Sequence, residues 1–356
     1  MTAQAHVSLE SWGIFQAHVS LEEARPRQAR AGVAACSDGH FIGERCVFVQ
    51  AWSIHHRKPP VVNSPSPAVE AFFHPDTGTF TYVVHDGDGS VAAIVDPVLD
   101  YDAAAARTAT RSADAVLAFV RAHRLRVEWI LETHAHADHL SAGAYLRDAL
   151  GAKLAIGRGI VDVQRTFKTL FGWGAEFVAD GRQFDRLLDD GEVIAIGALQ
   201  ARAMATPGHT RDSLTYLIGD AAFIGDTLFA PDVGSARCDF PGGDAAQLYA
   251  SIRRILALPE ATRLFLCHDY PPASRGEQAQ TSVAAQAANV HVAGAASEAA
   301  FVALRQARDA RLPVPRLLLP ALQVNIRGGR LPEADGNGIA YLRLPLNQLG
   351  HTTGVS

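Results

Sequence analysis

Seven side chains of the kinds that bind metal ions occur in this sequence, as one tight cluster and three single residues. The run THAHADH at residues 133–139 contributes four of them, namely His134, His136, Asp138 and His139. The single residues are His209, Asp226 and His268. Imidazole nitrogens and carboxylate oxygens are ligands that zinc, iron and manganese take from proteins. Four such donors so close together have no use in packing a core, and we therefore predict a metal centre.

The spacing within the cluster also suggests a catalytic pair. In an extended segment the side chains alternate between two sides, so that His134, His136 and Asp138 would project together. His139 adds a donor at the point where the strand gives way to the next helix. Asp138 directly precedes His139 and could move a proton at a metal-bound water. We take Asp138 and His139 as the candidate catalytic residues.

Each donor site follows an apolar run that is expected to form a β-strand. The segments are RVEWIL before the cluster, LQARAMATPGH ending at His209, AAFIGD ending at Asp226 and RLFLC before His268. Residues 112–124, 141–150 and 244–256 are expected to form helices. Strands and helices that alternate in two halves of the chain indicate an α/β layered domain.

The sequence divides into three parts. Residues 1–66 contain the heptapeptide QAHVSLE twice and otherwise show no clear period, so we predict a weakly ordered N-terminal extension. Residues 67–280 carry the strands and all seven donors and are predicted to form the catalytic domain. Residues 281–356 contain a helical pattern at 297–311 and a proline-containing tail, and we expect them to pack on the same domain.

The composition argues against several classes of function. The formal net charge is -5 and basic residues form no patch, which argues against binding to nucleic acid. No apolar stretch approaches the roughly 20 residues that a membrane helix needs. The four cysteines contain no CxxC pair, so neither a disulfide framework nor a cysteine-based zinc site is expected. We expect a cytoplasmic protein that acts on a small molecule, and a homodimer is left open.

As an ordered set, the donors resemble the motifs of the metallo-β-lactamase superfamily. The pattern HxHxDH is followed by His209, Asp226 and His268 in the superfamily's order, within residues 69–275. The resemblance implies an α/β fold, the four-layer αββα metallo-β-lactamase sandwich, with metal at one edge of its two sheets. By position, one metal site would consist of His134, His136, His209 and Asp226. The other would consist of Asp138, His139, Asp226 and His268.

Within that superfamily, the sequence resembles the persulfide dioxygenases, also called sulfur dioxygenases. The similar segments are TFTYVV at 79–84, IVDPV at 94–98, RCDF at 237–240 and HDY at 268–270. The resemblance implies one Fe(II) per chain, held by His134, His209 and Asp226, and oxidation of glutathione persulfide by O2 to sulfite and glutathione. Such a triad leaves three coordination positions of the iron open. The remaining donors would orient groups and move protons around it, or hold a second metal: His136, Asp138, His139 and His268.

Two other functions remain open on the sequence. A thioesterase like glyoxalase II would use two metal ions and a bridging hydroxide, and the donors for both ions are present. Zn2+, as one or two ions, is therefore the alternative cofactor. A non-catalytic metal-binding protein would instead need a closed site with no open coordination position.

Two residues are candidates for substrate binding. Glutathione carries carboxylates, which a guanidinium group binds in a bidentate manner. Arg237 lies between Asp226 and His268 in the segment RCDF, and Tyr270 follows His268 by two positions. The alternative is that Arg237 pairs with a nearby aspartate, Asp239 or Asp232, and only braces its own loop.

Overall fold

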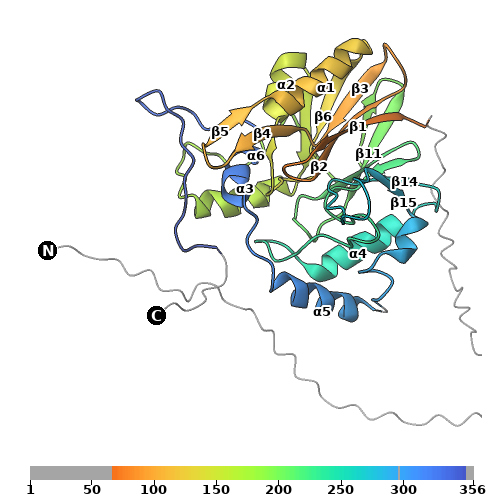
Figure 1. The fold of residues 1–356 in the computed structure, drawn as a ribbon. Coiled ribbons are helices and arrows are strands. Elements are labelled where there is room, and N and C mark those ends of the chain that lie inside the picture. Colours follow the sequence, from red (N-terminus) through yellow and green to blue (C-terminus); the bar gives the residue numbers. More distant parts are fainter. Residues whose placement is uncertain (1–65, 296, 350–356) are drawn as a thin grey trace, which may run out of the picture. The chain divides into compact units, whose positions relative to one another are not determined.

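Two mixed sheets of six strands each form the centre of the fold (Figure 1). The computed structural model describes residues 66–295 and 297–349, so the predicted extension, residues 1–66, lies outside the described residues except for its last residue. The first sheet has the order β1-β2-β3-β6-β8-β9, formed by Ala68–His74, Thr79–His85, Val91–Val95, Arg126–Leu131, Lys153–Gly157 and Arg186–Leu188. The second has the order β10-β11-β12-β13-β14-β15, formed by Val193–Ile196, Leu199–Ala205, Leu214–Ile218, Ala221–Phe223, Arg263–Phe265 and Gln280–Ser282.

Parallel strand pairs determine where the donor residues meet. β3 pairs with β6 in the first sheet and β13 pairs with β14 in the second, both in parallel. Parallel neighbours end at the same edge of a sheet, so the loops that follow them lie side by side. These loops carry the HxHxDH cluster after β6, Asp226 after β13 and His268 after β14.

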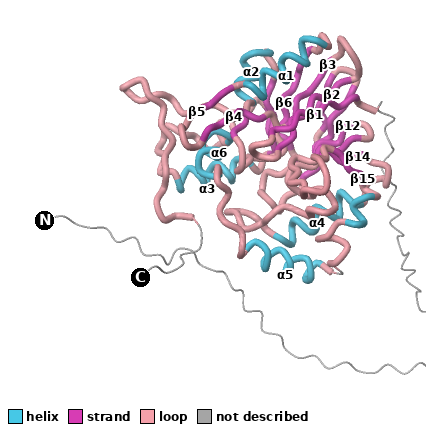
Figure 2. Tube along the Cα trace, viewed as in Figure 1, coloured by secondary structure: helices cyan, strands magenta, loops and turns pink. Residues whose placement is uncertain are grey.

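Helices cover the outer faces of both sheets, as Figure 2 shows. The hydrophobic core on the outer face of the first sheet includes α1, α2, α3 and α6, formed by Arg111–Ala122, Gly143–Leu150, Ile160–Leu170 and Leu318–Asn325. On the second sheet the covering helices are α4 and α5, formed by Ala245–Leu256 and Glu298–Asp309. A small sheet of order β5-β4-β7 (Arg107–Ala109, Val98–Asp102, Leu140–Ser141) and a 3-10 helix, η2 (Ala285–Ala288), complete the elements.

Alternating side chains divide the apolar residues into three cores. In β3, Ala92 and Ile94 pack toward the helices, whereas Ala93 and Val95 pack toward the second sheet. This is the period-two alternation of a strand that is buried on both faces. A third core lies between the second sheet and α4 and α5. The predicted four-layer αββα architecture is therefore confirmed.

Two helices were not expected from the sequence. The prediction treated the proline-containing segment after residue 311 as a tail, yet Leu318–Asn325 is helical. Pro320 lies in the first turn of that helix, where a backbone N–H would have no partner within the helix, so the proline does no harm. The other helix is α3. The predicted division of the chain at residues 66 and 280 remains a prediction. Among the described residues, no helix combines the length and apolar character of a membrane span.

Replacing Leu146 in α2 with alanine should destabilise the fold strongly. Its side chain is fully buried in the core between α2 and the first sheet, and such a truncation typically costs about 2–5 kcal/mol. Leu331→Ala is the matched control, because Leu331 is 47% exposed and should change the free energy of unfolding by less than about 0.5 kcal/mol. Equal effects in urea denaturation would show that the core is assigned wrongly.

Candidate metal centre

The loop between β6 and β7 carries the HxHxDH cluster, and the buried carboxylate of Asp96 holds it in place. The backbone N–H and the hydroxyl of Thr133 donate to the two oxygens of Asp96, over 2.7 and 2.8 Å. The Nε2 atom of His136 lies 3.0 Å from Oδ1 of Asp96. Asp96 is only 2% exposed, so these donors replace water around its charge. They also fix the path of the loop as it leaves the sheet.

His134, His209 and Asp226 form the first of two donor clusters. One ligand atom from each residue lies within 4.8 Å of the other two. The Nε2 atom of His209 is 3.6 Å from Oδ2 of Asp226, and all three residues are buried. His134 belongs to the loop after β6, whereas His209 and Asp226 follow strands β11 and β13. The cluster therefore joins the two sheets.

Hydrogen bonds on the far side of two rings determine which nitrogen faces this cluster. Nδ1 of His209 donates to the carbonyl oxygen of Arg237 over 2.7 Å. Nδ1 of His134 lies 3.1 Å from the hydroxyl oxygen of Thr133, whose own proton goes to Asp96. Both Nδ1 atoms thus carry the ring proton, and both Nε2 atoms present a lone pair to the cluster.

A glycine turn brings His209 to this position. Gly208 has φ +138°, and a Cβ atom there would lie 2.3 Å from the backbone nitrogen of Leu248 in α4. The backbone N–H of Asp244, the N-cap of α4, donates to the carbonyl oxygen of Gly208 over 2.8 Å. Only glycine allows the turn to approach the helix this closely. The turn directs the imidazole of His209 inward, toward Asp226.

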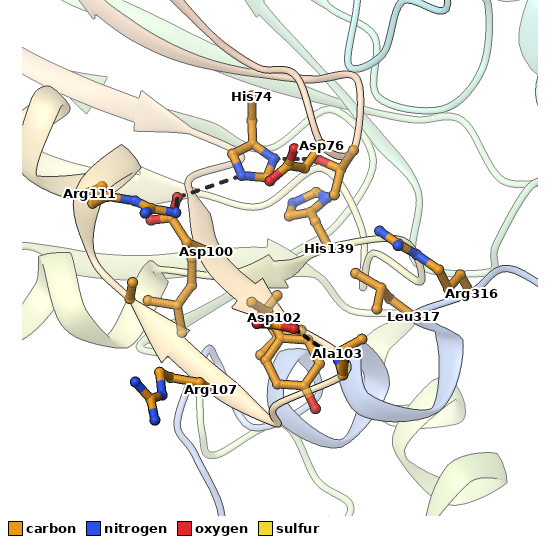
Figure 3. A pocket seen from close by; sticks show the side chains of 16 residues that line it. His74, Asp76, Asp100, Asp102, Ala103, Arg107, Arg111, His139, Arg316 and Leu317 are labelled. Atoms are coloured by element: carbon orange, nitrogen blue, oxygen red, sulfur yellow. Dashed lines mark hydrogen bonds and ion pairs between the residues drawn. The ribbon is translucent and has the colours of Figure 1, made fainter.

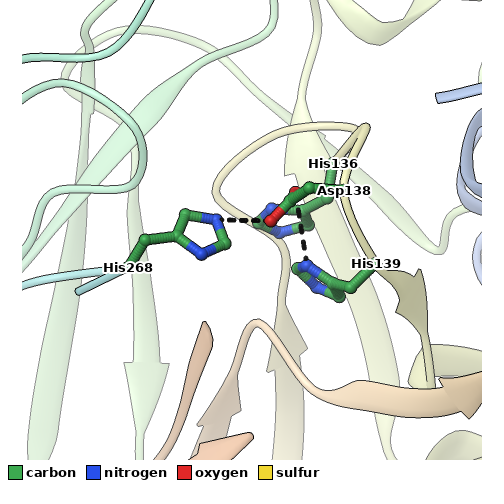
Figure 4. Close-up of side chains that lie close together, drawn as sticks. All are labelled: His136, Asp138, His139 and His268. Carbon is green, nitrogen blue, oxygen red and sulfur yellow. Dashed lines mark ion pairs between the residues drawn. The ribbon is translucent and has the colours of Figure 1, made fainter. Parts of the chain in front are cut away.

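The second donor cluster consists of His136, Asp138, His139 and His268 (Figure 4). Asp138 lies between two of the rings, with Oδ2 at 3.1 Å from Nε2 of His268 and Oδ1 at 3.5 Å from Nδ1 of His139. The Nε2 atom of His268 is also 3.4 Å from Oδ1 of Asp226. The carboxylate of Asp226 therefore borders both clusters.

The donor atoms fit a bound metal ion. Nε2 of His134, Nε2 of His139 and Oδ1 of Asp226 are buried and make no hydrogen bond within the described residues. Leaving a buried polar atom unpaired costs about 1–3 kcal/mol, and a metal ion would satisfy these lone pairs. Imidazole and carboxylate ligands suit zinc and iron alike. The arrangement therefore supports metal binding by these residues without selecting the metal.

Burial keeps two of the rings neutral, as metal binding requires. Burial, and then the charges of the neighbouring imidazoles, lower the pKa of His134 well below its ordinary value. The same two causes lower the pKa of His139 to about 4. At neutral pH both rings are therefore unprotonated at one nitrogen and ready to bind a cation.

His136 has different surroundings from the other rings. Its Nε2 atom faces two buried carboxylates, with Asp96 at 3.0 Å and Glu132 at 3.6 Å. Burial is the largest single influence on His136 and would lower its pKa, but the charges of Asp96 and Cys267 and the hydrogen bonds to them together raise that pKa well above its ordinary value. Glu132 in turn accepts a hydrogen bond from the hydroxyl of Ser141. These carboxylates engage Nε2 of His136 and orient its ring, so that Nδ1 is the nitrogen left for the second cluster.

A cavity of about 640 Å³ opens beside the second cluster (Figure 3). His139 forms part of its wall. Three arginines and three aspartates also line it, namely Arg107, Arg111, Arg316, Asp76, Asp100 and Asp102, and Arg111 pairs with Asp100 at 3.7 Å. Figure 3 shows the side chain of Arg316 pointing toward His139. A ligand in this cavity would lie next to His139, among both basic and acidic side chains.

Sequence comparison assigns the family. The model of the metallo-beta-lactamase superfamily matches residues 74–268, which include all seven donors. The chain belongs to the metallo-beta-lactamase superfamily. The superfamily part of the resemblance drawn from the sequence is thereby confirmed, and the chain is identified as a metal-binding member with the features of an enzyme.

The relatives within the superfamily carry different names. A Burkholderia pseudomallei protein named "probable metallo-hydrolase" is 52% identical over 292 residues, which are 79% of this chain and 99% of that protein. Glyoxylase B2 of Dictyostelium discoideum is 46% identical over 79% of this chain and 97% of its own length. The mitochondrial persulfide dioxygenase ETHE1 of Homo sapiens is 32% identical over 56% of this chain and 66% of its own length. Among solved structures, ETHE1 from Myxococcus xanthus has a TM-score of 0.59 and 29% identity, covering 74% of this chain and all (100%) of that chain.

In this superfamily member the two candidate substrate residues lie in different settings. The guanidinium of Arg237 donates to both oxygens of Asp239, at 2.6 and 2.7 Å, and to the carbonyl oxygen of Pro313. That pairing is the bracing alternative considered above. Tyr270 is 52% exposed, and its ring stacks on that of His268 with 5.7 Å between the ring centroids. Among the described residues, its hydroxyl makes no hydrogen bond.

Several residues of the centre were not singled out from the sequence. Besides Asp96 and Glu132, they include Asp212, which accepts the backbone N–H of Ala135 over 2.8 Å. The hydroxyl of Thr79 lies 3.4 Å from His139 and 3.2 Å from His268. Asp96 and Glu132 each follow directly after an apolar strand, and this position is the signal in the sequence that could have pointed to them. The others become visible only when the loops are placed together.

Removing the metal should destabilise this protein. A ligand that binds only the folded state at 100 times its Kd contributes about 2.7 kcal/mol, which corresponds to a Tm shift of several degrees. A scanning calorimetry experiment with and without chelator measures the shift. His123→Ala, outside both clusters with a side chain 38% exposed, should keep the shift, and His134→Ala should lose most of it. A shift that survives in His134→Ala would contradict the assignment.

Proposed function

We propose that this protein is a mononuclear iron persulfide dioxygenase, which oxidises a glutathione persulfide with O2 to sulfite and glutathione. The observation that supports this proposal is the grouping of His134, His209 and Asp226 within 4.8 Å of one another. Two imidazoles and one carboxylate on one side of the site are the ligand set of non-haem ferrous oxygenases.

Ferrous iron, when bound there, would supply the redox chemistry and the open positions for O2 and sulfur. The chain's own residues manage protons. Conversion of GSSH, O2 and H2O to GSH and sulfite releases two protons. Asp138 lies 3.1 Å from Nε2 of His268 and offers a polar route by which these protons can leave the site. The carboxyl side chain of Asp138 is 27% exposed and can pass protons on to solvent.

The cavity beside His139 supports a substrate with carboxylates. Within the described residues, Arg107 and Arg316 have no ion-pair partner, whereas the guanidinium of Arg237 is already paired with Asp239. A free guanidinium can bind a carboxylate without breaking an existing pair. We therefore infer that glutathione's carboxylates are bound mainly by Arg316 and Arg107, with Tyr270 at the opposite side of His268.

A glyoxalase II-like thioesterase is the second candidate. Two observations favour it: the relatives at 52% and 46% identity are named as a metallo-hydrolase and a glyoxylase, and the second donor cluster is complete. Asp226 borders both clusters, with one oxygen near His209 and the other near His268. Such a carboxylate could bridge two metal ions that activate a hydroxide for attack on a thioester. The choice between the candidates thus depends on metal number and identity.

Metal content and reaction should be measured on the same preparation. Protein purified anaerobically with ferrous iron should contain about one iron per chain, as a facial triad requires, and should consume O2 when glutathione persulfide is added. The thioesterase alternative is tested by measuring the hydrolysis of S-lactoylglutathione by zinc-loaded protein. Two tightly bound zinc ions, rapid thioester hydrolysis and no O2 uptake would sink the dioxygenase proposal and support the hydrolase.

Two substitutions test the roles of the donors. Asp226→Ala should abolish iron binding, because it removes the only carboxylate of the triad. His268→Ala should lower turnover but leave iron bound, with an affinity reduced by about 10- to 100-fold at most, as for groups that orient ligands. Metal analysis and O2 uptake, measured on both variants, show which of the two residues is needed to bind iron and which only for turnover. Equal loss of metal in both would point to a dinuclear site instead.

A further inference from the structure

One side chain from the C-terminal part of the chain holds the loop that carries the HxHxDH cluster. Asn325 is the last residue of α6, and its amide nitrogen donates to the carbonyl oxygens of His136 and His139, both over 2.8 Å. Its amide oxygen accepts the backbone N–H of Ser141 over 2.7 Å. We propose that Asn325 is a positioning residue of the metal centre, which sets the spacing of the donor residues by clamping their backbone.

The geometry of the amide explains why asparagine suits this position. Both of its N–H groups and its carbonyl oxygen are used, and the side chain is 4% exposed. The three contacted groups span residues 136–141, a stretch that forms no helix and only the two-residue strand β7. The backbone groups of such a stretch have few partners of their own and need outside ones when they are buried. Asn325 supplies three of them from one side chain.

The segment VNIRGG, residues 324–329, is built around this contact. Gly329 has φ +81°, and a Cβ atom there would lie 2.8 Å from the carbonyl oxygen of Ser141 and 2.9 Å from the backbone nitrogen of Ala144. Only glycine allows the segment to lie this close to the loop. The guanidinium of Arg327 lies over the ring of Trp173, 4.3 Å from its centroid, and the amide of Gln164 donates to the carbonyl oxygen of Ile326. The segment is therefore held from both sides.

The hydrogen bonds of Asn325 act on the metal centre as well as on the fold, because they end on the backbone of donor residues. The contacted carbonyl groups belong to His136 and His139 themselves, so a shift of either group moves an imidazole. Residues that orient ligands in this way affect metal affinity by about 10- to 100-fold when they are replaced. The inference holds for the dioxygenase and for the hydrolase, since both use donors from this loop.

A neighbouring amide provides a closely matched control. Gln323 lies on the same helix and is 1% exposed. Its amide nitrogen donates to the carbonyl oxygens of Leu319 and Arg343, and its amide oxygen accepts the N–H of Arg343. Gln323 thus makes the same number and kinds of bonds as Asn325, but to Leu319 of its own helix and to Arg343 in the C-terminal segment instead of the metal loop. A purely structural role would make the two positions equivalent.

The experiment compares Asn325→Asp with Gln323→Glu in the full-length protein. Each change turns a buried amide into a carboxyl group of the same shape. The new carboxyl oxygen replaces the amide nitrogen and faces the two carbonyl oxygens that this nitrogen contacted. The Kd for Zn2+ is measured by competition with a chelator of known affinity, and the visible spectrum of the Co2+-loaded protein reports the geometry of the ligands. We expect the Kd of Asn325→Asp to rise about 10- to 100-fold with an altered Co2+ spectrum. Gln323→Glu should stay within about threefold of the parent.

Asn325→Ala keeps the proposal testable if the aspartate variant does not fold, because it removes the donors without adding a charge. It should raise the Kd in the same direction, compared with Gln323→Ala. A Tm loss of Asn325→Ala with an unchanged Zn2+ affinity and Co2+ spectrum would overturn the proposal, and so would equal changes in affinity at positions 325 and 323.

Discussion

The hydrogen bonds to Asp96 are the interaction on which the centre depends. This carboxylate is buried at the end of β3, in a left-handed backbone conformation with φ 49°. It accepts two bonds from Thr133 and faces Nε2 of His136, and through Thr133 it also sets the tautomer of His134. A buried charge is tolerated only when such donors replace its hydration. The carboxylate and the loop therefore stabilise each other, and neither would adopt this conformation alone.

Around this contact, segments from distant parts of the chain hold the other donors. The carbonyl oxygen of Arg237 fixes the ring of His209, and the next residue, Cys238, donates its backbone N–H to the carboxylate of Asp309 in α5. Asp309 is paired in turn with the buried Arg305. α6 contributes Asn325 to the opposite side of the centre. The C-terminal helices, which lie beyond the matched family region, thus complete the support of the donors.

The same seven donors are compatible with two kinds of chemistry, and this explains why one fold hosts both hydrolases and oxygenases. Asp226 borders both clusters and can serve one metal or bridge two. Asp96 and Glu132 engage Nε2 of His136 and so orient this ring, whether one ion is bound or two.

The sequence by itself determined the donors and the layers. Four metal-binding residues in six positions have no other use, and the alternation in β2 and β3 and the spacing in α1 and α4 depend on local periods that can be read from the residues. The tertiary structure decided which donors group together, that Arg237 is paired with Asp239, and that Asn325 contacts the loop 186 and 189 positions before it. These are contacts between segments far apart in the chain, and no local pattern of residue types encodes which loops the two sheets bring to the same edge.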